Sequence, residues 1–283
     1  MKVSIQVNGL NLELAIVALR QVRPHEATVP RILDSIIADL ERSNYQRDPI
    51  LIDGKTRTAL DGMHRRAALK AIGAKFALCA EYDYLSDSIN LERWLRYFIA
   101  PNDEFLAEVI STLKLRKCED FHEAVRAVDK GRIRIALISA GMSYTSDQRK
   151  WDIFQVYEAV GKIDKLCQKY RIELEFTDDS SKFELFTSES VYLLYPLKIL
   201  KKHVLQIAKK GKVFPCKTTR HIVPIRPMGV YFPLELLRGS SESDCVEELK
   251  NIVKSSKIQI EEREVWYEGR RYSEPLAIFR REK

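Results

Sequence analysis

The segment from Val29 to Leu40 places the strongest constraint on how this 283-residue chain can fold. Its apolar residues recur at positions i, i+3, i+4, i+7, i+8 and i+11. They are Val29, Ile32, Leu33, Ile36, Ile37 and Leu40. This spacing places all six side chains on one face of an α-helix. The segment therefore predicts an amphipathic helix.

Short strands and a second helix are predicted around this helix. Residues 11–20 are typical of a strand, and residues 49–53 and 56–60 of two strands joined by a glycine-containing turn. A short helix is expected over 63–72 because a glycine follows it as a left-handed cap. Residues 76–82 alternate between apolar and polar side chains. The order strand, helix, hairpin, helix, strand indicates an α+β domain.

Further elements are predicted beyond residue 85 from periodicity alone. We expect helices over 88–99, 103–130 and 147–170, and another helix that contains Pro196 in its first turn. Strands are expected at 133–137 and 172–176, and an extended segment at 213–227. The tail from Ser240 predicts a polar helix followed by a hairpin around Glu268 and Gly269.

Composition excludes several classes of protein. The chain is 45% hydrophobic and 31% charged, as in an ordinary globular protein. Its net charge of +7 comes from 47 Lys and Arg dispersed among 40 acidic residues, which suits a nucleotide as well as a nucleic acid. The five cysteines are widely spaced, so neither a disulfide framework nor a zinc site is indicated. No apolar run approaches the roughly 20 residues of a membrane helix, and we expect a soluble, cytoplasmic protein.

The loop Asp61-Gly62-Met63-His64-Arg65 stands where a predicted strand ends and a predicted helix begins. The free N–H groups and the dipole at a helix N-terminus favour an anion. His64, Arg65 and Arg66 add further hydrogen-bond donors. The alternative is that Asp61 only caps the helix, Gly62 only makes a turn and the basic residues only face solvent.

A second polar segment is Arg23-Pro24-His25-Glu26, which directly precedes the predicted helix at 29–40. Pro24 fixes the backbone there. A carboxylate held at this position could accept a proton from a substrate hydroxyl. Alternatively, Glu26 is a solvent-exposed residue that complements the helix dipole.

The third segment is Lys217-Thr218-Thr219-Arg220-His221, a run of polar donors inside an otherwise extended, apolar region. A strand that only contributed to a core would have no use for such a run. An anion or carboxylate ligand explains it, and an exposed loop is the alternative.

Together these three segments resemble the archaeal free L-serine kinases of the ParB/sulfiredoxin-like superfamily. The order and spacing of all three match, and the similarity is clearest over residues 17–98 and 211–236. The resemblance implies an α+β fold with a ParB/sulfiredoxin-like N-terminal domain, a second α/β domain packed against it, and a cleft between them. The implied regions are a nucleotide-binding domain at 1–98, a second domain at 99–210, a return segment at 211–239 that completes the active site, and a C-terminal extension at 240–283.

The same resemblance implies the reaction and its residues. A free serine kinase transfers a phosphoryl group from ATP or ADP to the hydroxyl of L-serine and releases O-phospho-L-serine. Glu26 is expected to be the general base, with Asp61 and His64 as further catalytic residues. Nucleotide phosphates are expected at Asp61, Gly62, Met63, His64 and Arg65, and Mg2+ at Asp61. The residues expected to bind the amino acid are Trp94, Lys217, Thr218, Thr219, Arg220 and His221.

Met63 departs from the usual family pattern, in which the third position of the loop is histidine. The departure leaves the choice between ATP and ADP open. Sulfiredoxins carry a cysteine at this position, and a thioether cannot perform thiolate chemistry, so that activity is excluded. The alternative function is that of a ParB-like, nucleotide-dependent DNA-binding partition protein, which requires a helix-turn-helix region that residues 86–130 do not show convincingly. Nucleic acid is therefore not the expected partner, and the oligomeric state stays open.

Overall fold

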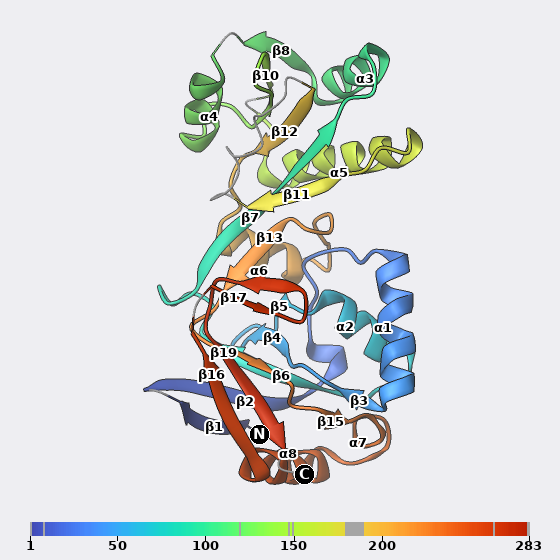
Figure 1. Cartoon of the computed structure of the whole chain (residues 1–283), viewed down its shortest axis with the longest axis vertical. Coiled ribbons are helices and arrows are strands. Elements are labelled where there is room, and N and C mark those ends of the chain that lie inside the picture. Colours follow the sequence, from blue (N-terminus) through green and yellow to red (C-terminus); the bar gives the residue numbers. More distant parts are fainter. Residues whose placement is uncertain are drawn as a thin grey trace. The chain divides into compact units, whose positions relative to one another are not determined.

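The computed structural model describes residues 2–7, 9–118, 120–146, 148, 150–178, 190–262 and 264–281. The chain forms two compact units (Figure 1). Unit 1 comprises residues 1–90, 204–213 and 221–283, and unit 2 comprises residues 91–203 and 214–220. Within the described ranges, no helix combines the length and the apolar character needed to cross a membrane.

Unit 1 is built on a mixed sheet that, over the described residues, has five strands in the order β1-β2-β6-β4-β5. Their bounds are β1 Lys2–Val7, β2 Leu10–Ala18, β4 Ile50–Asp53, β5 Ala59–Asp61 and β6 Phe76–Tyr82. Strand β4 runs parallel to β6, and the other neighbours are antiparallel. The predicted hairpin is confirmed, as are the strands predicted at 11–20 and 76–82, but the second hairpin strand begins at Ala59 rather than at residue 56.

Two helices lie side by side next to this sheet, α1 (Pro30–Ser43) and α2 (Met63–Ala71) (Figure 1). Pro30 stands in the first turn of α1, where its missing N–H costs nothing, and Asn44 ends the helix in the left-handed region at φ 59°. Leu40 is the fully buried member of the predicted apolar stripe, whereas Ile32 is 43% exposed. Both predicted helices are confirmed.

The chain after residue 221 adds a second sheet to unit 1, with the order β14-β19-β16. Its strands are β14 Arg226–Met228, β16 Ser256–Glu261 and β19 Leu276–Arg281. Between β16 and β19 lies the hairpin of β17 (Val265–Tyr267) and β18 (Arg270–Tyr272), which confirms the predicted turn at Glu268 and Gly269. The remaining elements are η1 Leu19–Gln21, β3 Tyr45–Gln46, β15 Phe232–Pro233, α7 Leu234–Gly239 and α8 Glu242–Ser255. Helix α8 packs against β1, β2 and β19.

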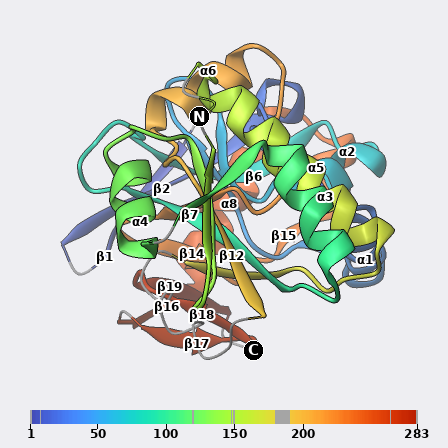
Figure 2. The same cartoon turned by 90° about the horizontal axis from the view of Figure 1, so that it is seen from above.

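Unit 2 contains a sheet that, in the part of the chain described, follows the path β11-β7-β12-β9-β10-β8, with β13 also paired to β7. Its strands are β7 Asn90–Ile99, β8 Leu115–Cys118, β9 Ile135–Ile138, β10 Ser143–Ser146, β11 Glu175–Asp178, β12 Val191–Pro196 and β13 Thr219–Ile222. Its helices are α3 Asp103–Leu113, α4 Phe121–Asp129 and α5 Ile153–Lys169, and α6 Lys201–Lys209 follows β12. Figure 2 shows α3 and α5 together on one side of the strands and α4 on the other.

The helix predicted over 88–99 is wrong, because these residues form β7. Leu91, Arg93 and Leu95 are buried at alternate positions, which is the period of a strand. The region 103–130 is not one continuous helix either. Lys114, with a φ of 52°, ends α3, and β8 follows before α4 begins.

Two helix starts in the middle of the chain also differ from the prediction. The helix expected from 147 begins at Ile153, because Asp152 and Gln155 form a capping box there, and residue 147 itself lies outside the described residues. Pro196 ends strand β12 rather than opening a helix, and α6 begins only at Lys201.

Candidate active site

The loop after β5 turns directly into α2. Gly62 precedes the first residue of α2 with a φ of 92°, a conformation that side-chain-bearing residues rarely adopt. A Cβ atom at Gly62 would lie 3.0 Å from Nη1 of Arg65 and 3.4 Å from Cα of Ile50. No side chain caps the helix, and helix geometry gives its first N–H groups no partner within the helix. The loop therefore leads into the uncapped N-terminus of α2, a position that favours an anion.

Asp61 is an ionised carboxylate at the start of this loop. Its Oδ1 accepts a hydrogen bond from the Gly62 N–H at 2.8 Å, and its Oδ2 forms an ion pair with Arg226. Burial disfavours the charge, but Arg226, Arg270 and Arg65 outweigh it and hold the pKa of Asp61 well below its ordinary value. The side chain remains 35% exposed and can be reached by a ligand.

The other side chains of the loop point in different directions. Met63 is 7% exposed and belongs to the core, so this residue can offer a ligand only its backbone. Nε2 of His64 accepts the N–H of Val29 at 2.9 Å. Arg65 donates from Nη1 to the carbonyl of Pro49 at 2.7 Å, and its Nη2 lies 3.8 Å from Oδ2 of Asp48.

The segment that contains His25 and Glu26 lies along β5. The Arg23 carbonyl accepts the Ala59 N–H at 2.8 Å, and Nδ1 of the fully buried His25 donates to the Ala59 carbonyl at 2.6 Å. Ala59 is two residues before Asp61 in the same strand. Glu26 has an 11% exposed side chain, and its Oε1 lies 3.7 Å from Nε2 of His25. Unit 1 therefore brings the predicted base and the predicted phosphate loop to the same strand.

His221 belongs to the same part of unit 1. Its ring packs edge-on against His25 with centroids 5.4 Å apart, and its Nε2 lies 2.8 Å from the hydroxyl of Tyr84. Burial, reinforced by His25, lowers the pKa of His221 well below its ordinary value. Burial also raises the pKa of Tyr84, with Asp53 and Glu26 acting in the same direction. Both groups are therefore neutral at physiological pH.

Unit 2 gathers the other residues predicted to bind the amino acid. Nζ of Lys217 lies 4.8 Å from the ring centroid of Trp94, and Cζ of Arg220 lies 5.3 Å from it. The Trp94 N–H donates to the Thr218 carbonyl at 3.3 Å, so β7 and the Lys217 segment are directly joined. Arg220 pairs with Glu92 at 3.2 Å and with Asp178.

A buried arginine, Arg96, holds the backbone of the Lys217 segment by hydrogen bonds. Arg96 donates to the carbonyls of Cys216 at 2.7 Å and Lys217 at 3.1 Å, while its Nε contacts Asp164 of α5 at 2.6 Å. Lys217 itself has a φ of 55° and an exposed side chain, whereas Thr218 and Thr219 are buried. The segment thus carries one exposed cation beside an aromatic ring, with charge–π attraction between them.

Arg226 is a candidate site residue that sequence reasoning missed. It lines a cavity of about 250 Å³ together with Asp61, Arg65 and Arg270. A signal was present, because an arginine interrupts the otherwise apolar stretch from Ile222 to Val230. A charged residue in such a stretch indicates a buried ion pair.

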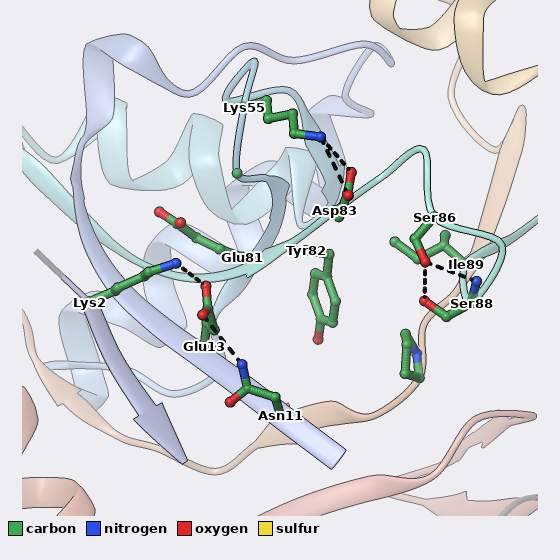
Figure 3. A pocket seen from close by; sticks show the side chains of 12 residues that line it. Lys2, Asn11, Glu13, Lys55, Glu81, Tyr82, Asp83, Ser86, Ser88 and Ile89 are labelled. Atoms are coloured by element: carbon green, nitrogen blue, oxygen red, sulfur yellow. Dashed lines mark hydrogen bonds and ion pairs between the residues drawn. The ribbon is translucent and has the colours of Figure 1, made fainter. Parts of the chain in front are cut away.

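A second hollow of about 470 Å³ lies in unit 1 and contains none of the predicted site residues. Figure 3 shows two ion pairs there, Lys2 with Glu13 and Lys55 with Asp83, and the remaining labelled carboxylate, Glu81, pairs with Arg57. Because these charges are already matched by neighbours, nothing in this hollow indicates a ligand.

The carboxylate of Asp61 is a suitable oxygen ligand for a magnesium ion at the loop. Among the described residues, no cluster of three or more His, Cys, Asp or Glu side chains could hold a metal by itself. Mg2+ usually keeps its waters and binds through one or two carboxylates plus substrate phosphates. Asp61, ionised and partly exposed, fits that pattern.

No protein-family model matches the sequence. The chain is 24% identical over 242 residues to an ATP-dependent L-serine kinase of Staphylothermus marinus, an alignment that covers 81% of this chain and 92% of that protein. It is 27% identical over 237 residues to the ADP-dependent L-serine kinase of Thermococcus kodakarensis. That alignment covers 80% of this chain and 93% of the kinase. A ParB-like protein of Sulfolobus acidocaldarius is also 27% identical over 214 residues, and the alignment covers 75% of this chain and 92% of that protein.

Solved structures extend this likeness to the fold. A free serine kinase in complex with AMP has a TM-score of 0.67 and 25% identity, and covers 79% of this chain and 93% of that one. A variant of a free serine kinase, with alanine in place of a glutamate and ADP bound, has a TM-score of 0.68 at 25% identity and the same coverage. SbnI from Staphylococcus aureus, with its C-terminus truncated, has a TM-score of 0.70 at 18% identity, which shows a shared fold only.

Proposed function

We infer that this chain, a homologue of the archaeal L-serine kinases, is itself a nucleotide-dependent free serine kinase. It transfers a phosphoryl group from ATP or ADP to the hydroxyl of L-serine. The observation that carries the proposal is the position of Glu26 in unit 1, where its segment is bonded to the strand that leads into the anion-binding end of α2. Phosphoryl transfer needs charge neutralisation and positioning more than covalent chemistry.

In the proposed reaction, the carboxylate of Glu26 accepts the proton of the serine hydroxyl. The serine oxygen forms a bond to the terminal phosphorus, and the bond from that phosphorus to the nucleotide oxygen breaks. The charge of the phosphates is met by the first N–H groups of α2, by His64 and by Arg65. Mg2+, where it is bound, neutralises further phosphate charge, and Asp61 is its proposed protein ligand.

Trp94 and the segment Lys217 to His221 are the proposed amino-acid site. Lys217 is an exposed cation beside the ring of Trp94, and a serine carboxylate can pair with it. The Thr218 hydroxyl donates to the Pro215 carbonyl at 2.8 Å, and Arg220 pairs with Glu92 and Asp178, so these side chains hold the segment in place.

The experiment that tests the function is direct. The purified protein is incubated with L-serine, magnesium and either ATP or ADP, and O-phosphoserine is quantified by mass spectrometry. We expect product with at least one donor, and comparison of the two rates identifies the preferred nucleotide. Absence of product with both donors, together with tight binding of duplex DNA, would support the ParB-like function instead.

A further inference from the structure

Three groups hold the guanidinium of Arg226 at the same time. Its Nε donates to Oε1 of Glu274 at 2.6 Å, its Nη1 pairs with Oδ2 of Asp61, and its Nη2 donates to the His221 carbonyl at 3.3 Å. Each nitrogen of the planar group thus has its own acceptor, which fixes both the position and the plane of the guanidinium. The three acceptors come from the phosphate loop, from the polar run at 217–221 and from the tail after residue 240.

Arg226 and Glu274 are both buried, with 5% and 4% of their surface exposed. Burial opposes the charge on Arg226, but Asp61 and Glu274 together raise the pKa of its guanidinium, so it remains a cation. One cation therefore faces two carboxylates. Arg270 and Arg65 also stabilise the negative charge of Asp61, and its side chain stays 35% exposed, so a ligand can reach it.

The backbone around Glu274 is fixed independently of its side chain. Strand β19 pairs in parallel with β14, with Leu276 opposite Arg226, and the Arg226 N–H donates to the Pro275 carbonyl at 2.9 Å. Removal of the Glu274 carboxylate would therefore leave the strand pairing in place. The side chain can be tested without dismantling the tail.

Asp61 and Arg226 form part of a cavity wall, whereas Glu274 does not. Both line the cavity of about 250 Å³, and Glu274 is not among its lining residues. Glu274 thus reaches the cavity wall through its ion pair with Arg226. This arrangement is typical of a residue that does not touch the ligand itself but orients a ligand-binding carboxylate through a shared hydrogen-bond partner.

We propose that Glu274 is a positioning residue for phosphoryl transfer: it holds Arg226, and Arg226 orients the carboxylate of Asp61 for the magnesium nucleotide. The proposal rests on the kinase function and adds a residue of the C-terminal tail to its machinery. The contacts that carry it are the two side-chain ion pairs of Arg226 and its bond to His221.

The test compares Glu274→Ala with Glu274→Gln. In Glu274→Ala the KM for the nucleotide should rise about tenfold, while the KM for serine stays within twofold. Glu274→Gln keeps an amide oxygen that can accept from Nε of Arg226, so it should restore most of the nucleotide KM. An unchanged nucleotide KM in Glu274→Ala, or equal damage in both variants, overturns the positioning role.

A matched control separates positioning from loss of stability. Leu249 is a fully buried residue of α8 in the same tail, and Leu249→Ala should destabilise the tail without removing a partner of Arg226. All variants are assayed at a temperature at which their unfolding curves show only folded protein. If Leu249→Ala raises the nucleotide KM as much as Glu274→Ala, the proposal fails.

Calorimetry supplies a readout other than activity. The dissociation constant of ADP in the presence of magnesium should be about tenfold weaker for Glu274→Ala than for the wild type. If Glu274→Ala and the wild type bind ADP equally well, and the wild type forms phosphoserine, this inference alone is overturned. Absence of phosphoserine from the wild type with both donors overturns the kinase proposal itself.

Discussion

The backbone N–H of Val29 donates a hydrogen bond to Nε2 of His64 over 2.9 Å. Val29 is the N-cap residue of α1, three residues after Glu26, and His64 stands in the first turn of α2. This bond joins the two helix starts, and with them the proposed base and the proposed phosphate site. It also assigns the ring proton of His64 to Nδ1, because Nε2 acts as the acceptor.

Replacing His64 should therefore affect both stability and nucleotide binding. In His64→Ala the Val29 N–H loses its acceptor, and we expect a loss of about 1 kcal/mol in the free energy of unfolding. Nucleotide affinity should fall as well, because the joined helix starts loosen. Urea unfolding and calorimetry measure the two effects, with the exposed α2 substitution Lys70→Ala as control. An unchanged affinity in His64→Ala would contradict the role of this bond.

Replacing Glu26 should separate chemistry from binding. Glu26→Gln keeps the size of the side chain but cannot accept the serine proton, so we expect phosphoserine formation to fall by at least about a hundredfold. The dissociation constant of the nucleotide should stay within about threefold of the wild type, since the first N–H groups of α2 are untouched. Glu41→Gln, on the exposed side of α1, is the control, and full turnover by Glu26→Gln would rule out the proposed base.

Replacing Lys217 should weaken serine binding alone. Lys217→Ala removes the exposed cation beside Trp94, and we expect the KM for serine to rise about tenfold or more with little change in the KM for the nucleotide. Lys217→Arg, which keeps the charge, should lose less. The control is Lys212→Ala, an exposed lysine five residues earlier. A parallel rise in both KM values would contradict a specific role for Lys217.

His221 should make stability depend on pH. Its folded-state pKa lies well below its unfolded value of about 6.5, so below that pH the unfolded chain binds more protons than the folded one. The stability that the neutral, buried ring contributes is complete above pH 6.5 and falls as the pH drops toward the folded pKa. The slope can reach about 1.4 kcal/mol per pH unit for one proton.

The measurement for His221 is denaturant unfolding at pH 5 and pH 7.5. His221→Gln retains a polar group opposite the Tyr84 hydroxyl but does not titrate, so its stability should change less between the two pH values than that of the wild type. His203, whose pKa is also lowered by burial, is present in both proteins and cancels from the comparison. Identical pH dependence in the two proteins would refute the assignment.

Local patterns determined much of unit 1. The stripe from Val29 to Leu40, the glycine-containing hairpin and the left-handed Gly73 after α2 are each specified within a few residues, and all were predicted correctly. The region 88–99 was predicted wrongly. Its alternating burial includes Arg93, whose charge hides the period of two. The guanidinium is accommodated there because it donates to the Pro196 carbonyl, pairs with Asp129 at 3.3 Å and stacks on Tyr195.

The sequence by itself determined which elements form near the N-terminus and which residues offer donors and carboxylates. Only the tertiary structure decided how those groups are paired. Asp61 meets Arg226 across 165 residues, and Arg226 meets Glu274 through a parallel strand pair. The physical reason is that helix and hairpin signals act over a few residues, whereas the charge state of a buried carboxylate depends on whichever distant cation the fold brings beside it.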